Sequence, residues 1–280
     1  MIEVGDEMPS TPEIGSAVKT GSFQTNCHDV GSGDPVVFIH GSGPGVTAWA
    51  NWRLVIPELS KTLRVIAPDM VGFGYTDRPA GIVYTKETWV HQLKDLLDTL
   101  SIERIDLVGN SFGGAISLAF AILYPERVRK IVLMGSAGTY WKVTDGLAAV
   151  WGYEPSIEAM RKLLDIFAFD RTLVTDELAK LRFEASIQPG FQEAFAAMFP
   201  PPHQRWLDAL ASEDPALQAL PHETLIFHGR EDKVVPLESS LRLHHLIPRS
   251  QLHVFGQCGH WTQIEKTADF IRLVKGFLAS

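Results

Sequence analysis

LVGNSFGG, at residues 107–114, is the stretch that decides the fold of this 280-residue chain. An apolar run leads into it and the apolar run 113–123 continues it, which predicts a strand, a tight turn and a helix. Gly109 and Gly113 flank Ser111 in the pattern G-x-S-x-G, which is typical of a nucleophilic serine on a strained turn. Side chains at the two glycines would collide within such a turn. A glycine-rich turn with an incidental serine is the alternative, and the strand and helix around it make this less favoured.

Six short apolar runs, including the one before Ser111, have the composition of strands buried on both faces. Helical patterns alternate with them, as in 86–100, where the apolar residues fall on one helical face. This alternation predicts an α/β fold with a mostly parallel sheet. Residues 16–31 predict a leading antiparallel hairpin. The six runs are 35–41, 64–69, 104–109, 129–135, 223–229 and 251–256.

The pattern changes between about residues 140 and 210, where helices are predicted and no strong strand. Ser156 is the predicted cap of one helix, and a second is predicted to follow Thr175 and Asp176. Turns at 189–191 and 199–203 and one more helix complete the block. The predicted apolar face of the first helix comprises Ile157, Met160, Leu163, Leu164 and Phe167.

A helical block between two sheet strands predicts a lid over the carboxyl edge of the sheet, where α/β proteins bind ligands. We therefore expect a first core segment at 1–139, a helical lid at 140–209 and a second core segment at 210–280.

A serine nucleophile needs a base within hydrogen-bond reach and an acid that orients the base. Downstream of Ser111, Asp232 follows one predicted strand and His260 follows the last one. Either residue alone is more often an ordinary loop residue. In the order Ser, Asp, His, and at the ends of strands, they favour a catalytic triad.

The glycine-rich segment 40–45 follows another predicted strand, and its glycines permit unusual backbone dihedrals. We expect the backbone amides of Ser42 and Phe112 to form an oxyanion hole. A plain connector or a phosphate loop is less favoured, because the segment has neither G-x-G-x-x-G spacing nor a following lysine.

The net charge and the cysteine content argue against several classes of function. The net charge of −8 argues against a nucleic-acid surface, and it means that an anionic substrate needs a local cation. Cys27 and Cys258 form no CxxC motif, and no apolar run is long enough to span a membrane. The first 15 residues lack the apolar run of a signal peptide, so we expect a cytoplasmic protein. No pair of histidines has convincing metal-ligand spacing.

Several long stretches resemble the meta-cleavage product hydrolases, a family of α/β-hydrolases from bacterial aromatic degradation. The resemblance runs from about residue 12 to the C-terminus, and the contexts GNSFGG, ANWR and CGHW are similar to the single-ring branch with 2-hydroxymuconic semialdehyde hydrolase. Phe112 stands where the biphenyl-type branch typically has Met. The stretches are 40–53, 67–79, 109–114, 181–195, 228–243 and 253–265.

The resemblance implies an α/β-hydrolase fold with an eight-stranded, mostly parallel sheet and a helical lid after the sixth strand. It implies hydrolysis of a carbon–carbon bond in a 2-hydroxy-6-oxohexa-2,4-dienoate, without cofactor or metal, by a dimer or higher homo-oligomer such as a tetramer. The loop around Asp232 resembles the family's G-x-x-D-x-[VI]-[VI]-P pattern, which favours Asp232 over Glu231 as the triad acid.

Arg182 is the candidate for the local cation. On the helix after Asp176, Leu178, Leu181 and Ala185 predict an apolar stripe that includes Arg182. A core-facing arginine there is suited to a bidentate clamp on a carboxylate. The alternative is a snorkelling arginine at the edge of the stripe, and the resemblance favours the clamp.

The resemblance also implies further substrate-binding residues. They are Gly41, Asn51, Asn110 and Trp261 around the polar part of the substrate, and Ala137, Trp151, Leu207 and Val234 around its C6 substituent. Ala137 is small, which leaves room for a methyl or short alkyl group.

Two other functions are compatible with parts of this pattern. A carboxylesterase would use the same triad, and a non-catalytic ligand receptor would keep the fold without needing a base. A dehalogenase is disfavoured, because its nucleophile would be an aspartate in place of Ser111.

Overall fold

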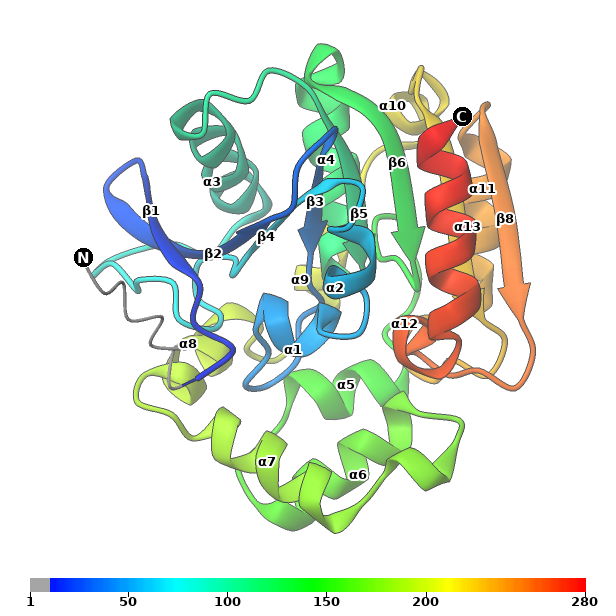
Figure 1. The fold of residues 1–280 in the computed structure, drawn as a ribbon. Helices are drawn as coiled ribbons and strands as arrows, with labels where there is room; N and C mark the ends of the chain where they lie inside the picture. The colour runs from blue at the N-terminus through cyan, green and yellow to red at the C-terminus, as the bar shows by residue number, and fades with distance from the viewer. Residues whose placement is uncertain (1–10) are drawn as a thin grey trace.

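A single eight-stranded sheet runs through the structure, a computed structural model that describes residues 11–280 (Figure 1). Residues 1–10 lie outside the described residues. They include the start of the predicted first core segment and most of the stretch considered for a signal peptide. The strand order is β1-β2-β4-β3-β5-β6-β7-β8. The strands are β1 (Ser16–Thr20), β2 (Phe23–Val30), β3 (Pro35–Ile39), β4 (Arg64–Pro68), β5 (Ile105–Asn110), β6 (Val128–Met134), β7 (Glu223–Gly229) and β8 (Ser250–Phe255).

The sheet is mostly parallel, as predicted. β1 pairs with β2 in antiparallel register, which confirms the leading hairpin, and β2 is also antiparallel to β4. The other pairs, from β4–β3 across the sheet to β7–β8, are parallel. The six predicted apolar runs become these parallel strands, with bounds that differ by one or two residues.

Side chains that alternate along β3 separate the hydrophobic core into two layers. Val37 and Ile39 belong to the cluster that also buries the apolar faces of α3 and α4, whereas Val36 and Phe38 pack with Trp52 on the opposite face. This two-sided burial explains the continuous apolarity of the strand sequences. The helices outside the lid are α1 (Ala48–Trp52), α2 (Ile56–Leu59), α3 (Lys86–Thr99), α4 (Phe112–Leu123), α10 (Asp214–Gln218), α11 (Leu237–Leu246), α12 (Thr262–Glu265) and α13 (Thr267–Ala279), with the 3₁₀ turn η1 (Pro125–Arg127).

Helices fill the region between β6 and β7, and α5, α6 and α7 gather beyond the carboxyl ends of the parallel strands (Figure 1). The Ser156 hydroxyl caps the first predicted helix by accepting from the Ala159 amide, and Thr175 caps the second in the same manner. The helices are α5 (Asp145–Trp151), α6 (Ile157–Phe167), α7 (Asp176–Ser186), α8 (Phe191–Met198) and α9 (Gln204–Leu210), with the 3₁₀ turn η2 (Arg171–Leu173).

Two details of the helical block differ from the prediction. Ile157 is 51% exposed, because it is the first residue of α6 and the burial of this face begins one turn later, at Met160 and Leu163. The sequence predicted one helix after the turn at 189–191, and the structure has two, because α8 begins directly at Gly190, whose left-handed backbone (φ 80°) starts the helix.

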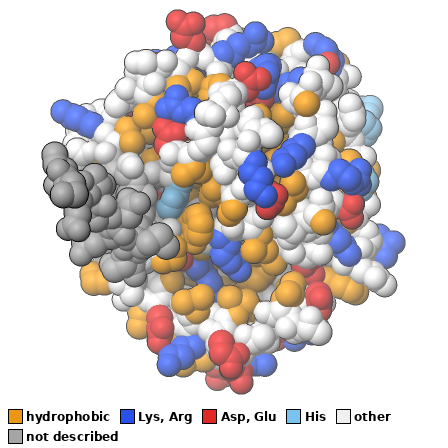
Figure 2. All heavy atoms as spheres, in the orientation of Figure 1, with side chains coloured by type: hydrophobic (Ala, Val, Ile, Leu, Met, Phe, Trp, Pro, Cys, Tyr) orange, Lys and Arg blue, Asp and Glu red, His pale blue; other side chains and the backbone are white. Residues whose placement is uncertain are grey.

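Charged side chains of both signs are interspersed over the face of the molecule drawn in Figure 2. Within residues 11–280, no helix is long and apolar enough to cross a membrane.

Candidate active site

Ser111 lies between β5 and α4 with φ 53° and ψ −113°, a backbone conformation that non-glycine residues rarely adopt. A Cβ atom at Gly109 would lie 2.5 Å from the Gly113 carbonyl oxygen, and one at Gly113 would collide with the Ile39 carbonyl. The strained turn predicted from the glycines is therefore present. The Ser111 amide donates to the Met134 carbonyl at 2.9 Å, which ties the turn to β6.

His260 and Asp232 form a buried pair beside this turn. His260 Nδ1 lies 2.7 Å from Asp232 Oδ2, and the two side chains are 5% and 1% exposed. The amides of Val234 and Val235 donate to Asp232 Oδ1 at 2.7 and 3.0 Å. Both oxygens of the Asp232 carboxylate are thus engaged. Because His260 uses Nδ1 in this pair, Nε2 is the ring nitrogen that remains for proton transfer.

The loop that carries Asp232 is held by a histidine in β7. His228 is fully buried, with Nδ1 2.7 Å from the Ser240 hydroxyl and Nε2 3.1 Å from the Val235 carbonyl. Burial lowers the pKa of His228, which keeps its ring neutral beside the carboxylate.

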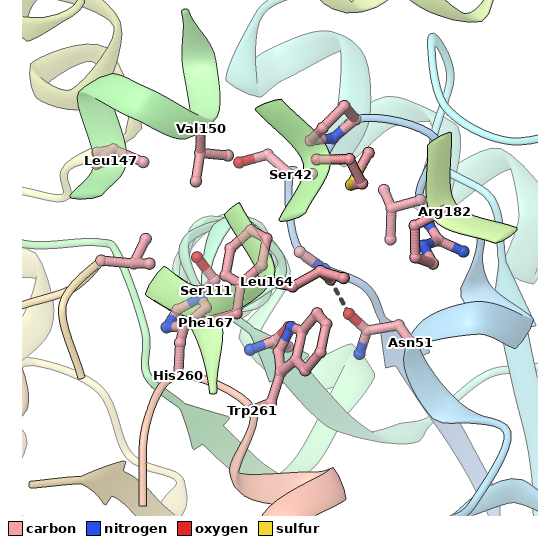
Figure 3. A pocket seen from close by; sticks show the side chains of 17 residues that line it. Ser42, Asn51, Ser111, Leu147, Val150, Leu164, Phe167, Arg182, His260 and Trp261 are labelled. Carbon is pink, nitrogen blue, oxygen red and sulfur yellow. Dashed lines mark hydrogen bonds between the residues drawn. The ribbon is translucent and has the colours of Figure 1, made fainter. Parts of the chain in front are cut away.

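Ser111 and His260 line one cavity and lie on the same side of it in Figure 3, across from Arg182. Gly135, with φ 49°, lies beside the pair, and a Cβ there would be 3.2 Å from both Asp232 Oδ2 and His260 Nδ1. The structure therefore brings the three predicted triad residues together, from the ends of β5, β7 and β8. This arrangement is suited to removing a proton from a serine hydroxyl or a water molecule.

The glycine-rich loop at 40–45, the predicted oxyanion loop, is fixed through both polar groups of Gly41. Its amide donates to Asn51 Oδ1 at 3.3 Å, the bond drawn in Figure 3. The Met70 amide donates to His40 Nε2 at 3.0 Å, so the ring proton lies on Nδ1, which donates to the Gly41 carbonyl at 2.8 Å. Burial lowers the pKa of His40 to about 4, which keeps this proton arrangement at neutral pH.

Because the C=O and N–H of a trans peptide point in opposite directions, the Ser42 amide points away from the His40 ring. Neither the Ser42 amide nor the Phe112 amide donates to another group within residues 11–280. Both predicted oxyanion donors are therefore available to a ligand. The glycines signalled this loop, whereas nothing in the sequence pattern signalled the role of His40.

The cavity is small and partly open to solvent. Its two ends differ in chemistry. Arg182 and Asn51 supply polar groups at one side (Figure 3), and residues of α5 and α6 supply an apolar wall. The apolar lining includes Leu147, Val150, Met160, Leu164, Phe167 and Val234.

Arg182 is the cationic side chain of the cavity lining and is 13% exposed. One guanidinium nitrogen donates to the Gly45 carbonyl at 2.6 Å, and Glu13 Oε1 lies 3.7 Å from the other terminal nitrogen. Burial lowers the pKa of Arg182 from its ordinary value, although a guanidinium stays protonated at neutral pH. Because the side chain has five N–H donors, donors remain for a carboxylate.

The stripe predicted around Arg182 is wrong at Leu181, which is 60% exposed, whereas Leu178 and Ala185 are half-buried. The fully buried residues of α7 are Ala179 and Ser186. A Cβ at Gly45 would lie 2.6 Å from the Ser186 amide, so α7 packs directly on the oxyanion loop through its small residues. Arg182 shares this face and is directed to the cavity by it.

The other predicted substrate residues divide into two groups. Gly41, Asn51, Asn110, Trp261 and Val234 line the cavity. The Nδ2 donor of Asn51 is buried and has no partner among the described residues, whereas Nδ2 of Asn110 donates to the Met134 carbonyl at 3.2 Å.

Ala137, Trp151 and Leu207 are buried but do not border the cavity. Trp151 stacks on Phe199 with ring centroids 4.3 Å apart and donates from Nε1 to the Ser42 hydroxyl at 3.1 Å. The Ala137 amide donates to the Ser111 carbonyl at 3.1 Å.

The apolar wall from the lid was missed as a site. Leu147 and Val150 of α5, and Met160 and Leu164 of α6, face the cavity. The apolar face of α6 was visible in the sequence, but periodicity alone does not separate side chains that fill a core from those that face a ligand.

Within residues 11–280, no group of three or more His, Cys, Asp or Glu side chains is placed to hold a metal ion.

Comparison with known proteins agrees with this geometry. The family model described as "alpha/beta hydrolase fold" matches residues 34–267. A 2-hydroxy-6-oxo-2,4-heptadienoate hydrolase of Pseudomonas putida is 66% identical over 268 residues, which cover 96% of this chain and 97% of that protein. The chain belongs to the meta-cleavage product hydrolases, within the α/β-hydrolase family.

Two further members of this family are similarly close. A 2-hydroxymuconate semialdehyde hydrolase of a Pseudomonas species is 64% identical, over 96% of this chain and 95% of that protein. A serine-to-alanine mutant of the meta-cleavage product hydrolase of Pseudomonas fluorescens, solved in complex with acetates, superposes with a TM-score of 0.95 at 64% identity. The superposition covers 96% of this chain and 99% of that one.

Proposed function

We propose that this meta-cleavage product hydrolase cleaves a carbon–carbon bond in 2-hydroxy-6-oxohexa-2,4-dienoates, including 2-hydroxymuconic semialdehyde and its 6-methyl ketone. The products are 2-hydroxypenta-2,4-dienoate and a carboxylic acid, as in the meta-cleavage pathway of aromatic catabolism. The names of the two relatives at 66% and 64% identity support this reaction. The proposal needs no metal and no cofactor.

One observation carries the proposal. A histidine oriented by a buried aspartate shares a single cavity with a serine on a strained turn, and a buried arginine lies across from both. This spacing of a hydrolytic group and a fixed cation suits a substrate with a carboxylate at one end and a carbonyl at the other. An ordinary ester does not need the arginine.

We assign the anionic end of the substrate to Arg182 and Asn51. The free guanidinium donors suit the carboxylate and the adjacent C2 oxygen, and the unpaired Asn51 Nδ2 suits the same oxygens. This orientation directs the C6 carbonyl toward Ser111 and the amides of Ser42 and Phe112.

His260 has two proton transfers in this mechanism. It first mediates ketonisation, in which the proton of the C2 hydroxyl is lost and C5 gains a proton. It then takes a proton from Ser111 or from a water molecule as that oxygen attacks C6. The charge that develops on the C6 oxygen is stabilised by the amides of Ser42 and Phe112.

The C5–C6 bond then breaks, and its electron pair passes into the C5–C2 chain as a dienolate. The negative charge is delocalised toward the C2 oxygen, beside Arg182. After proton uptake, this fragment is 2-hydroxypenta-2,4-dienoate, and the C6 fragment leaves as the carboxylic acid with an oxygen from water.

The C6 substituent is proposed to lie against Val234 and the apolar wall from α5 and α6. Ala137, Trp151 and Leu207 are buried outside the cavity lining. A hydrogen or methyl group at C6 is expected to be accepted.

A spectrophotometric panel tests the reaction. Yellow dienoates with hydrogen, methyl, isopropyl or phenyl at C6 are mixed with the enzyme and the loss of colour is followed, with 4-nitrophenyl acetate as the ester comparison. We expect the highest kcat/KM for hydrogen or methyl and poor turnover of the ester. Fast ester turnover without dienoate cleavage would favour a carboxylesterase. Tight dienoate binding without turnover would favour a receptor.

Three wider features belong to the same proposal. Residues 140–209 act as a lid between the core segments 1–139 and 210–280, supported by the position of α5 to α7 over the strand ends. The enzyme acts in the cytoplasm, and it acts as a homo-oligomer. Size-exclusion chromatography with light scattering tests the last point, and a monomer at working concentration would contradict it.

A further inference from the structure

The loop that carries His260 is in backbone contact with the end of lid helix α6. The His260 amide donates to the Phe167 carbonyl at 2.8 Å. A Cβ at Gly259 would lie 2.5 Å from the same carbonyl oxygen and 2.8 Å from the Phe169 amide nitrogen. Because no side chain separates the two backbones, a shift of the α6 end would displace His260.

Glu265 bridges these two segments. Its Oε2 accepts from the Gly259 amide at 2.7 Å, and its Oε1 accepts from the amides of Phe169 and Asp170 at 2.9 and 2.7 Å. One carboxylate at the end of α12 thus holds one N–H of the histidine loop and two N–H groups of the lid. A carboxylate can do this because both of its oxygens only accept hydrogen bonds.

The ring of Phe167 takes part in the same contact. It stacks on Trp261 with centroids 5.1 Å apart and lies 6.0 Å from the His260 ring, while it also lines the cavity. The seating of the α6 end therefore sets both a wall of the cavity and one side of the imidazole.

We propose that Glu265 is a positioning residue that couples the seating of the lid to the alignment of His260 with Asp232 and Ser111. Glu265 does not border the cavity, so it acts through the Gly259 and Phe167 backbones and not on the substrate. The inference rests on the proposed role of His260 as the base. It does not depend on which dienoate is the substrate.

Glu265→Gln tests this with a change of one atom. The amide NH₂ cannot accept a hydrogen bond, so either the Gly259 side or the lid side loses its acceptor. We expect kcat to fall about tenfold to a hundredfold, because misplacement of a catalytic group by about 1 Å has an effect of that size. KM should change less than about threefold, because Arg182 and Asn51 are untouched.

Two readouts do not depend on the dienoate. The rate at which a fluorophosphonate probe labels Ser111 should fall by the same factor as kcat. The downfield N–H proton signal of the His260–Asp232 bond in the NMR spectrum should weaken or shift. Glu103→Gln, an exposed glutamate just before β5 at the opposite edge of the sheet, is the matched control and should behave as wild type.

Gly259→Ala is the second variant, because its Cβ would meet the Phe167 carbonyl at 2.5 Å and Glu265 Oε2 at 3.1 Å and so disturb the same contact from the loop side, and it should slow probe labelling in the same way. Labelling and turnover within twofold of wild type in a folded Glu265→Gln protein would overturn the proposal. Slowed labelling in a protein that cleaves no dienoate would support this inference and reject only the proposed substrate. Wild-type protein that the probe does not label and that cleaves no dienoate would overturn both.

Discussion

The loops at the strand ends and the helices of the lid build the two halves of this cavity by different means. Ser111, Asp232 and His260 come from three loops. Hydrogen bonds and closely packed glycines hold these loops in place, and the backbone at Ser111 is strained. The lid contributes Arg182 and an apolar wall from faces of helices, where neighbouring side chains decide the direction.

This difference separates chemistry from recognition. The groups proposed to move protons are fixed by backbone geometry, which tolerates little change. The groups proposed to recognise the substrate are side chains on helices, which can be exchanged with the fold retained. Substitutions at the strand ends should therefore abolish turnover, and substitutions in the lid should change affinity and selectivity.

Ser111→Ala or His260→Ala should have the largest effect. We expect kcat to fall at least about 10³-fold, because each variant removes the nucleophile or its base. The measurement is steady-state cleavage of the 6-methyl dienoate, with circular dichroism to verify folding. Turnover at the wild-type rate in either variant would reject the assignment.

Arg182→Gln tests the recognition half. Loss of charge-assisted hydrogen bonds to a carboxylate should lower kcat/KM about tenfold to a hundredfold, since such bonds contribute about 1.5–3 kcal/mol. Turnover of 4-nitrophenyl acetate should change little, because it carries no carboxylate. Lys180→Gln on the same helix, where the lysine side chain is 68% exposed, is the control. An equal loss on both substrates would show that Arg182 supports the structure and not the substrate.

His40→Gln tests whether the oxyanion loop depends on a neutral histidine. The pKa of His40 is about 4 in the folded protein, against an ordinary histidine value of 6.5, so the unfolded chain binds the proton first as pH falls. The stability that neutral His40 contributes is complete above about pH 6.5 and is lost toward pH 4. Between pH 7 and 5, the free energy of unfolding of wild type should fall relative to His40→Gln by about 2 kcal/mol.

Urea unfolding of both proteins at several pH values measures this difference. Asp69, whose pKa burial raises to about 7, acts in the opposite direction, because its contribution is lost as pH rises from 3.8 to 7. Asp69 is present in both proteins, so the comparison isolates His40. Parallel stability curves would contradict the prediction.

Leu164→Ala in the lid wall should have the smallest effect. Removing a buried side chain that faces the cavity should improve kcat/KM for the 6-isopropyl relative to the 6-methyl dienoate by about fivefold to tenfold, near the lower limit of the roughly 1–3 kcal/mol that one methylene contributes in such a pocket. Ile157→Ala on the same helix, at a position 51% exposed, is the control. Unchanged selectivity in Leu164→Ala would place the C6 group elsewhere.

The same two regions differ in how much of their structure could be predicted from the sequence. The strand ends were predictable, because the turn at Ser111 allows only glycine at 109 and 113, and triad residues follow strands in a fixed order. The lid was predictable as helices, since Ser156 and Thr175 are clear caps. The buried face of α7 was not predictable, because the small residues Ala179 and Ser186 are buried while Leu181 is exposed.

The contacts that join the two regions could also not be predicted from the sequence. His40, Trp151 and Glu265 act on segments 30 or more positions away or through backbone groups, and no local pattern reports such pairings. The resemblance identified the residues near the site, but their separation into cavity lining and supporting core required the structure.

The most direct test of the central claim is a product balance, because ketonisation alone would also remove the yellow colour. Wild-type enzyme is given a known amount of the 6-methyl dienoate, and both products are measured by NMR as the colour disappears. One equivalent each of 2-hydroxypenta-2,4-dienoate and acetate per dienoate consumed is the predicted result. Loss of colour without acetate would show that the cavity moves protons but does not break the carbon–carbon bond.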